Sequence, residues 1–342
     1  MILENFSLPI WVYAYGSPSG KGEIRTLPED FIVEETLAFE PSGNGEHVFL
    51  QIQKTGENTE YVARQLARFA NVRQRDIGFA GMKDRHAITT QWFSVWLPKG
   101  DEPNWTEFAT ENMIVLHVTR HARKLKRGAL ANNRFSLTIR NWQGHKTKTI
   151  EQLTEIKNHG VANYYGSQRF GHGGQNVAKA LAMFQGTKVG REQRSLYLSA
   201  ARSFLFNHIL ATRIEQNSWQ TGLNGDVFML DGSRSCFACE IIDEDIRNRL
   251  TQNLLHATGA LVGKGETRVS ASAFEIEQKI IETYSELKTG LVAFGVESDR
   301  RALRVNVANL IWEFSNENTL KLHFNLPAGS YATALLRELI SL

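Results

Sequence analysis

The order of strand-like and helix-like patterns constrains the fold of this chain more than any other feature. Before residue 160, apolar residues alternate with polar ones, as at Val48, Leu50 and Ile52, which is typical of half-buried strands. A strand-like run resumes at 319–326 and leads into a closing helix. Between these two strand-rich parts the pattern is mainly helical. The helical runs are 177–184, 199–214 and 274–287.

This order predicts an α+β protein whose first domain is interrupted. Thr149 and Gln152 form a capping-box pair at the start of a short helix, and Gly160 is placed to end it. We therefore expect a domain boundary there. The predicted organisation is a first domain in residues 1–159, a mainly helical insertion in 160–305, and completion of the first domain in 306–342.

Length and composition indicate a globular protein. The 342 residues are 42% hydrophobic, which is enough for a sizeable core and for two domains. The sequence shows neither a signal-peptide pattern nor the run of about 18 apolar residues that a membrane helix needs. We expect a cytoplasmic monomer without a membrane partner.

The basic residues are concentrated in one part of the chain. Residues 112–191 hold 14 basic and two acidic side chains, although the whole chain carries only +3. A stretch with so few acidic residues favours a polyanion such as RNA as partner, while the alternative is a solvated surface. The residues predicted to contact an RNA backbone are Arg120, Arg123, Lys124, Lys126, Arg127 and Arg169.

Two cysteines, Cys236 and Cys239, form one C-x-x-C motif in the return strand of a predicted hairpin. A zinc site normally needs four ligands, and the sequence contains no second motif of this kind. We expect packed thiols and no metal.

A polar loop follows the strand-like residues Ile77 to Ala80. It presents Lys83, Asp84, Arg85 and His86 before a second strand begins near Gln91. Polar clusters on loops between rigid strands are often functional, although Asp is also a common turn residue. The loop alone does not separate these two interpretations.

Several motifs along the chain, in a fixed order, resemble one family, the TruD family of tRNA pseudouridine synthases. They are P-E-D-F at 28–31, G-E-H-V at 45–48, F-A-G-M-K-D-R-H-A at 79–87, G-A-L at 128–130, N-Y-Y-G-S-Q-R-F-G at 163–171, L-S-A-A-R-S at 198–203, L-F-N at 205–207 and L-P-A-G-S-Y-A-T at 326–333.

The resemblance implies an isomerase that converts a uridine of tRNA, at position 13, to pseudouridine. It also implies a catalytic domain built on a mixed, mostly antiparallel sheet with flanking helices. Asp84 matches the catalytic aspartate, and Arg25 stands where the family carries a basic residue near it. The residues expected to contact substrate are Phe31, Lys83, Asn133, Phe135 and Tyr331.

The chemistry suits these residue types. The reaction breaks the N-glycosidic bond and rejoins the base through carbon 5, so it needs a carboxylate beside the sugar and no metal, redox group or small-molecule cofactor. Asp84 could act as a nucleophile or stabilise an oxocarbenium-like sugar. Two alternatives are an RNA-binding protein without catalysis, in which Asp84 only shapes its loop, and a hydrolase of the same bond.

Overall fold

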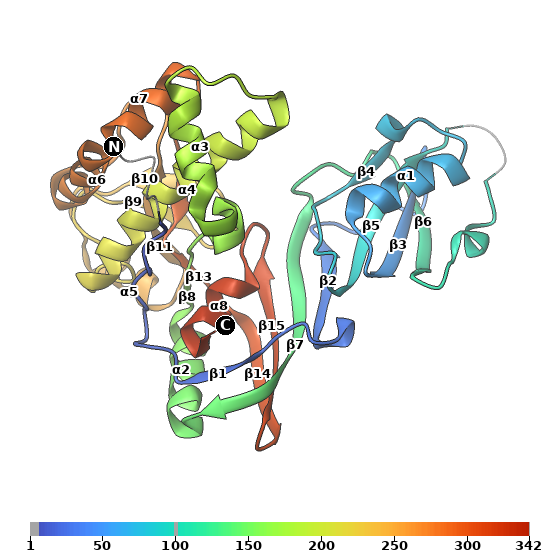
Figure 1. The fold of residues 1–342 in the computed structure, drawn as a ribbon, viewed down its shortest axis with the longest axis horizontal. Helices are drawn as coiled ribbons and strands as arrows, with labels where there is room; N and C mark the ends of the chain where they lie inside the picture. Colours follow the sequence, from blue (N-terminus) through green and yellow to red (C-terminus); the bar gives the residue numbers. More distant parts are fainter. Residues whose placement is uncertain (1–6, 99–101, 342) are drawn as a thin grey trace. The chain divides into compact units, whose positions relative to one another are not determined.

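The computed structural model describes residues 7–98 and 102–341 and forms two compact units (Figure 1). The sheet unit comprises Ser19–Thr147, Val307–Gly329 and Ile340–Leu342. The helical unit comprises Met1–Pro18, Lys148–Asn306 and Ser330–Leu339. These bounds differ from those of the predicted domains, so the assignment of catalysis to 1–159 and 306–342 stays a prediction.

The sheet unit is built on a mixed, mostly antiparallel sheet, as predicted. In the described part of the chain ten strands join it, and the pairs β2–β5 and β1–β16 are parallel. The strands along the main path are β14 (Ala308–Asn316), β15 (Thr319–Pro327), β7 (Leu130–Gly144), β2 (Phe31–Leu37), β5 (Ile88–Trp96), β3 (His47–Thr55) and β6 (Met113–His121). The remaining strands are β1 (Gly20–Glu23), β4 (Ile77–Phe79) and β16 (Ile340–Ser341).

Helix α1 (Thr59–Phe69) covers one side of this sheet. Asn58 caps it by accepting a hydrogen bond from the Tyr61 amide at 2.8 Å. Val62 and Leu66, spaced by about one helical turn, form its apolar face and are buried against β3, β4 and β5. The short helix η2 (Gln74–Asp76) then leads into β4 and the Asp84 loop.

Strand register determines which side chains share the face of the sheet used by the candidate site. Lys54 on β3 lies opposite Thr89 on β5, and Thr89 lies opposite Val33 on β2. Glu35, two residues after Val33, lies opposite Asn133 on β7. Since side chains alternate between faces, Lys54, Glu35 and Asn133 belong to one face of the sheet.

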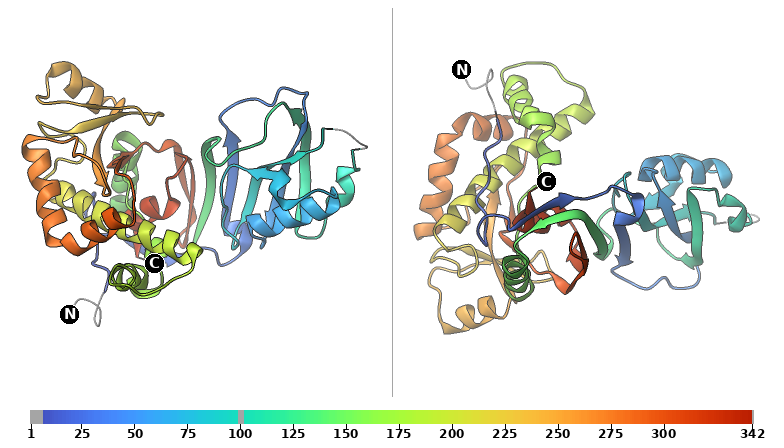
Figure 2. Two further views of the ribbon diagram at one scale, coloured as in Figure 1. Left: turned by 90° about the horizontal axis from the view of Figure 1, so that it is seen from above. Right: turned by 60° about the horizontal axis from the view of Figure 1, so that its bottom comes forward.

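The helical unit has its own core. Its helices are α2 (Lys146–His159), α3 (Gln175–Phe184), α4 (Arg191–Glu215), α5 (Glu244–Thr251), α6 (Ala271–Thr283), α7 (Ser285–Ala293) and α8 (Ala332–Leu339). Two small sheets complete it: β10 (Cys236–Ala238), β9 (Val227–Leu230), β11 (Leu255–Leu261) and β12 (Asp299–Ala302) in one, and β13 (Arg304–Val305) and β8 (Val161–Ala162) in the other. Figure 2 shows α4 surrounded by these elements. Its buried face includes Phe204, Leu205 and Phe206, which pack in the main core cluster.

Several predicted helix boundaries were wrong. Helix α4 begins at Arg191, well before the predicted start at 199. Helix α2 begins at Lys146, so Thr149 is buried inside the helix and does not cap it. Its predicted end is correct, because Gly160 adopts φ +77° and donates its amide to Ile156. The single helix predicted for 274–287 is divided at Tyr284 into α6 and α7.

The helical unit encloses a fully buried ion pair. Arg213 on α4 donates to both carboxylate oxygens of Asp226, at 2.8 and 2.6 Å, and the two side chains are 2% and 0% exposed. Arg213 also donates to Ser218, and Asp226 accepts from the Leu223 amide at 2.7 Å. This network fixes the turn that follows α4.

Replacing one member of this pair should destabilise the helical unit strongly. Asp226→Asn leaves a buried guanidinium without a charged partner, so we expect the free energy of unfolding to fall by about 3–5 kcal/mol. Asp245→Asn is the matched control, because it removes a 3.7 Å pair with Arg249 in which the aspartate is exposed, worth about 1 kcal/mol or less. Chemical denaturation measures both. Similar losses in the two variants would contradict the prediction.

Candidate active site

The loop between β4 and β5 carries Asp84, which lies beside Arg25. Arg25 Nη2 is 2.5 Å from Asp84 Oδ2, and the Asp84 side chain is 44% exposed. Among the described residues no donor contacts the other carboxylate oxygen, Oδ1. The structure therefore pairs the predicted aspartate with the predicted basic residue and leaves one carboxylate oxygen accessible.

Arg25 also lies over the ring of Phe31. Its guanidinium carbon is 4.1 Å from the ring centroid, a cation–π contact. Phe31 is only 2% exposed and meets Phe135 edge to face, at 6.3 Å between centroids. Phe135 in turn stacks on Phe324 at 5.2 Å. Both predicted aromatic residues thus belong to the packed face of the sheet, with Arg25 over the Phe31 ring.

The backbone at Arg25 is strained, because φ is +60° at a residue that carries a side chain. Such conformations concentrate at functional sites, where surrounding contacts maintain them. Here the contacts are those with Asp84 and Phe31.

Asn133 contributes an unsatisfied amide to the same face of the sheet. Its Oδ1 atom is buried and finds no hydrogen-bond partner among the described residues, and the same holds for Arg25 Nε. An unsatisfied buried polar atom costs about 1–3 kcal/mol and therefore calls for an explanation. A bound ligand that donates a hydrogen bond to this amide oxygen would provide that explanation.

Lys83 is anchored below the loop. Its Nζ atom is 2.5 Å from Glu35 Oε2, and the two side chains are 6% and 0% exposed. Glu35 Oε1 accepts from the Trp92 amide at 3.3 Å. This placement favours a role in loop order over the substrate contact expected from the sequence.

Further hydrogen bonds hold the main chain of the loop. Thr59 Oγ1 accepts from the Lys83 amide at 2.9 Å and donates to Gln91, whose side chain donates to Gly81 O. Lys54, buried beneath the loop, donates to Asp84 O at 3.3 Å. The loop is therefore fixed from β2, β3, β5 and α1.

Comparison with known proteins identifies the family. A family profile described as tRNA pseudouridine synthase D (TruD) matches residues 7–188 and 174–339. The chain belongs to the TruD family. A protein of Methylococcus capsulatus named tRNA pseudouridine synthase D is 47% identical over 329 residues, covering 96% of this chain and 93% of that one. One of the same name from Nitrosococcus oceani is 46% identical over 335 residues, covering 96% and 94%.

The fold agrees with this family. The crystal structure described as a putative TruD of Methanosarcina mazei has a TM-score of 0.75, covers 98% of this chain and 99% of that chain, and is 21% identical. At that identity the likeness concerns the fold alone. It confirms the predicted α+β fold class of a pseudouridine synthase.

Tyr331, which the TruD motifs also indicate, lies in the helical unit. Its hydroxyl accepts a 2.5 Å hydrogen bond from Arg169 Nη2, and Arg169 Nη1 donates to Ser199 at 3.0 Å. Arg301 lies over the ring of Tyr165, 4.2 Å from its centroid. The sequence indicated Arg169 and Tyr331 separately but not their contact.

The predicted basic cluster divides into bound and exposed side chains. Arg120 is paired with Glu102 at 2.6 Å, Lys124 donates to Arg75 O at 2.6 Å, and Arg127 lies over the Phe79 ring. Arg123, Lys126 and Arg127 are all exposed, but Arg123 and Lys126 have no interaction partner in the described part of the chain. These two are the stronger candidates for phosphate contacts.

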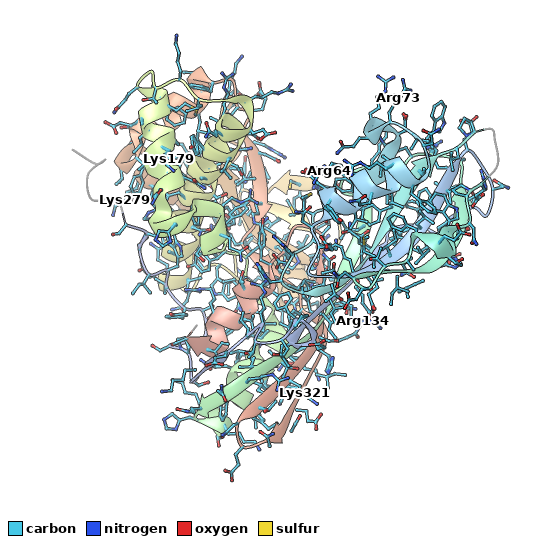
Figure 3. All side chains as sticks on the ribbon, turned by 45° about the vertical axis from the view of Figure 1, so that its right-hand side comes forward. Arg64, Arg73, Arg134, Lys179, Lys279 and Lys321 are labelled. Atoms are coloured by element: carbon cyan, nitrogen blue, oxygen red, sulfur yellow. The ribbon has the colours of Figure 1, made fainter. Side chains whose placement is uncertain are left out.

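Basic side chains that charge counting missed lie on α1. Arg64, labelled in Figure 3, and Arg68 are both exposed. Their spacing of four residues places them on one side of the helix. They lie outside residues 112–191, the segment in which the sequence concentrates its basic side chains.

The described residues contain no cluster of three or more His, Cys, Asp or Glu side chains that could hold a metal ion. Cys236 and Cys239 are free, half-buried thiols, and burial raises the pKa of each. No helix of the described chain is long and apolar enough to span a membrane.

The strained backbone at Arg25 generates a stability prediction. Arg25→Gly and Arg25→Ala both remove the ion pair and the ring contact, but only glycine adopts φ +60° without steric cost. We expect the glycine variant to be more stable than the alanine variant by about 1 kcal/mol. Denaturant unfolding of the two proteins measures the difference. An alanine variant at least as stable as the glycine variant would show that no strain is stored there.

Proposed function

We propose that this protein isomerises a uridine of tRNA to pseudouridine, with Asp84 as the catalytic carboxylate. The observation that carries the proposal is the Asp84–Arg25 pair on a loop fixed from below, within a chain of the TruD family. Position 13 of tRNA is the target that the family resemblance implies.

The geometry suits breakage of a glycosidic bond. Arg25 orients the carboxylate through Oδ2, so Oδ1 can approach carbon 1′ of the ribose. As the bond to N1 breaks, Asp84 either forms an ester with carbon 1′ or stabilises the cationic sugar. The uracil then turns, carbon 5 bonds to carbon 1′ in place of the ester or the cationic centre, and a base removes the proton from carbon 5 while N1 takes up a proton. No atom is gained or lost overall, which makes the reaction an isomerisation.

Asn133 is the proposed contact for the uracil edge. An amide offers both an acceptor and donors, which matches the N3–H donor and the carbonyl acceptors of uracil. The buried Oδ1 atom would gain the hydrogen bond that it lacks among the described residues. The target base must leave its stack first, and we propose that Phe31 contacts the extruded nucleotide in the sheet unit. For Tyr331, in the helical unit, a substrate contact is proposed separately, from the family motif alone.

The exposed basic residues are proposed to hold the tRNA through its phosphates. Such contacts position an RNA without discriminating its bases. Arg123 and Lys126 carry this role in the sheet unit, and the half-buried Arg169, which also contacts Tyr331 and Ser199, is the candidate in the helical unit. We further propose that the protein acts as a cytoplasmic monomer.

Substitution of Asp84 tests the proposal directly. Asp84→Asn removes the charge with little change in shape, so we expect no detectable pseudouridine in unmodified tRNA while tRNA affinity stays within about threefold. Asp76→Asn, at another ion-paired aspartate of the sheet unit, serves as control. Mapping of pseudouridine and a binding assay give both readouts.

Three outcomes would redirect the assignment. Turnover by Asp84→Asn would remove Asp84 from the chemistry. Release of free uracil by the wild-type protein would instead indicate a hydrolase. Binding of tRNA with neither product would favour an RNA-binding protein.

The phosphate contacts are tested by salt dependence. We expect Arg123→Gln and Lys126→Gln each to reduce the magnitude of the negative slope of log affinity against log salt by about one unit, since each removes one phosphate contact. Arg120→Gln should change it much less, because Glu102 already pairs with this arginine. An unchanged slope in the first two variants would place the RNA surface elsewhere.

A further inference from the structure

Lys54 is a buried cation directly beneath the Asp84 loop. It follows Val48, Leu50 and Ile52 on the same face of β3, and it is 1% exposed. Its Nζ atom donates to Glu57 O at 2.6 Å and to Asp84 O at 3.3 Å. No carboxylate among the described residues forms an ion pair with it. A fully buried lysine without a paired carboxylate is rare, because desolvation of the ammonium group is costly.

The electrostatic environment of Lys54 is dominated by burial. Burial, followed by repulsion from Lys83, lowers the pKa of Lys54 to about 8, while Asp84 and Glu57 act in the opposite direction. Lys83 itself is paired with Glu35. Keeping Lys54 charged in the folded protein therefore lowers the free energy of unfolding.

Two further contacts connect the turn around Lys54 to the same loop. Arg85 Nε donates to Gly56 O at 3.0 Å, and the Gly56 amide donates to Ala87 O at 3.4 Å. Of these contacts, the one from Lys54 reaches the main chain of Asp84 itself. The other two fix the loop on its C-terminal side.

We propose that Lys54 is a positioning residue for Asp84: its ammonium group fixes the Asp84 main chain and attracts the carboxylate from below, while Arg25 orients it from the side. The inference rests on the proposed function of Asp84. It explains why a costly buried charge lies at this position, where an apolar residue would complete the alternation of β3.

Loss of this contact affects the chemical step more than binding. Lys54 contacts the loop from the buried face of β3, so its removal leaves the exposed basic residues unchanged. A displacement of about 1 Å at a catalytic group can reduce the rate by about 100-fold.

The first experiment compares Lys54→Met, an unbranched side chain one heavy atom shorter and without the charge, with Lys54→Arg, which keeps the charge. For Lys54→Met we expect a single-turnover rate of pseudouridine formation about 10- to 100-fold lower, with tRNA affinity within about threefold of wild type. Lys54→Arg should recover most of the rate. An unchanged rate in the methionine variant, or an arginine variant equally slow, would overturn the proposal.

The second experiment separates positioning from stability by pH. Because the pKa of Lys54 is lower in the folded than in the unfolded protein, the unfolded state binds more protons between pH 8 and 10.5, so stability from this residue rises with pH there. Loss of the ammonium charge should lower the rate over the same range. As the pH rises from 8 to 10.5, the free energy of unfolding of the wild type should therefore increase relative to that of Lys54→Met. Over the same change in pH the wild-type rate of pseudouridine formation should fall.

A purely structural lysine would not give these opposite trends. In Lys54→Arg, whose guanidinium stays charged, the fall in rate should move to higher pH. A wild-type rate that does not fall above pH 8, or a fall that Lys54→Arg leaves in place, would refute the proposal even if Lys54→Met fails to fold. Asp84→Asn is run in parallel: its activity would refute the proposed function, whereas an inactive Asp84→Asn beside a fully active Lys54→Met would refute only the role of Lys54.

Discussion

The buried contact between Lys83 and Glu35 ties the loop that carries Asp84 to the sheet. Glu35 occupies its position because β2 pairs with β5 on one side and β7 on the other, and this register also places Asn133 opposite it. Either charge alone would be strongly unfavourable at this depth, so the two side chains hold each other in place. The loop therefore takes its position from the central strands of the sheet unit.

Three cations surround one candidate nucleophile, and the structure gives them different tasks. Arg25 contacts the carboxylate, Lys54 contacts its main chain, and Lys83 is neutralised by Glu35. A preorganised arrangement of this kind needs little rearrangement when charge develops on the sugar. The cost is visible in the backbone strain at Arg25 and in the burial of Lys54.

Much of the fold was predictable because its strands and helices have strong local patterns. Alternation of apolar and polar residues located β3, and Gly160 marked the end of α2. The start of α2 was not predictable from Thr149, because that residue is buried by tertiary packing. The division between α6 and α7 carries no proline that would mark it in the sequence.

The site was predictable only in part. Family motifs indicated Asp84, Arg25 and Asn133, and the structure brings the first two together. The sequence does contain one indication of Lys54: a charged residue stands at the fourth position of the apolar alternation of β3, after Val48, Leu50 and Ile52. Its role depends on a contact 30 residues away, which no local pattern encodes.

Arg25 also has a consequence for how this position can vary among related sequences. Its planar guanidinium serves a carboxylate at one edge and an aromatic ring on one face. A lysine keeps the charge but presents a compact ammonium that cannot lie flat on Phe31 while it pairs with Asp84. Exchange of arginine for lysine at residue 25 would therefore keep a positive charge beside Asp84 and lose the planar contact with the ring of Phe31.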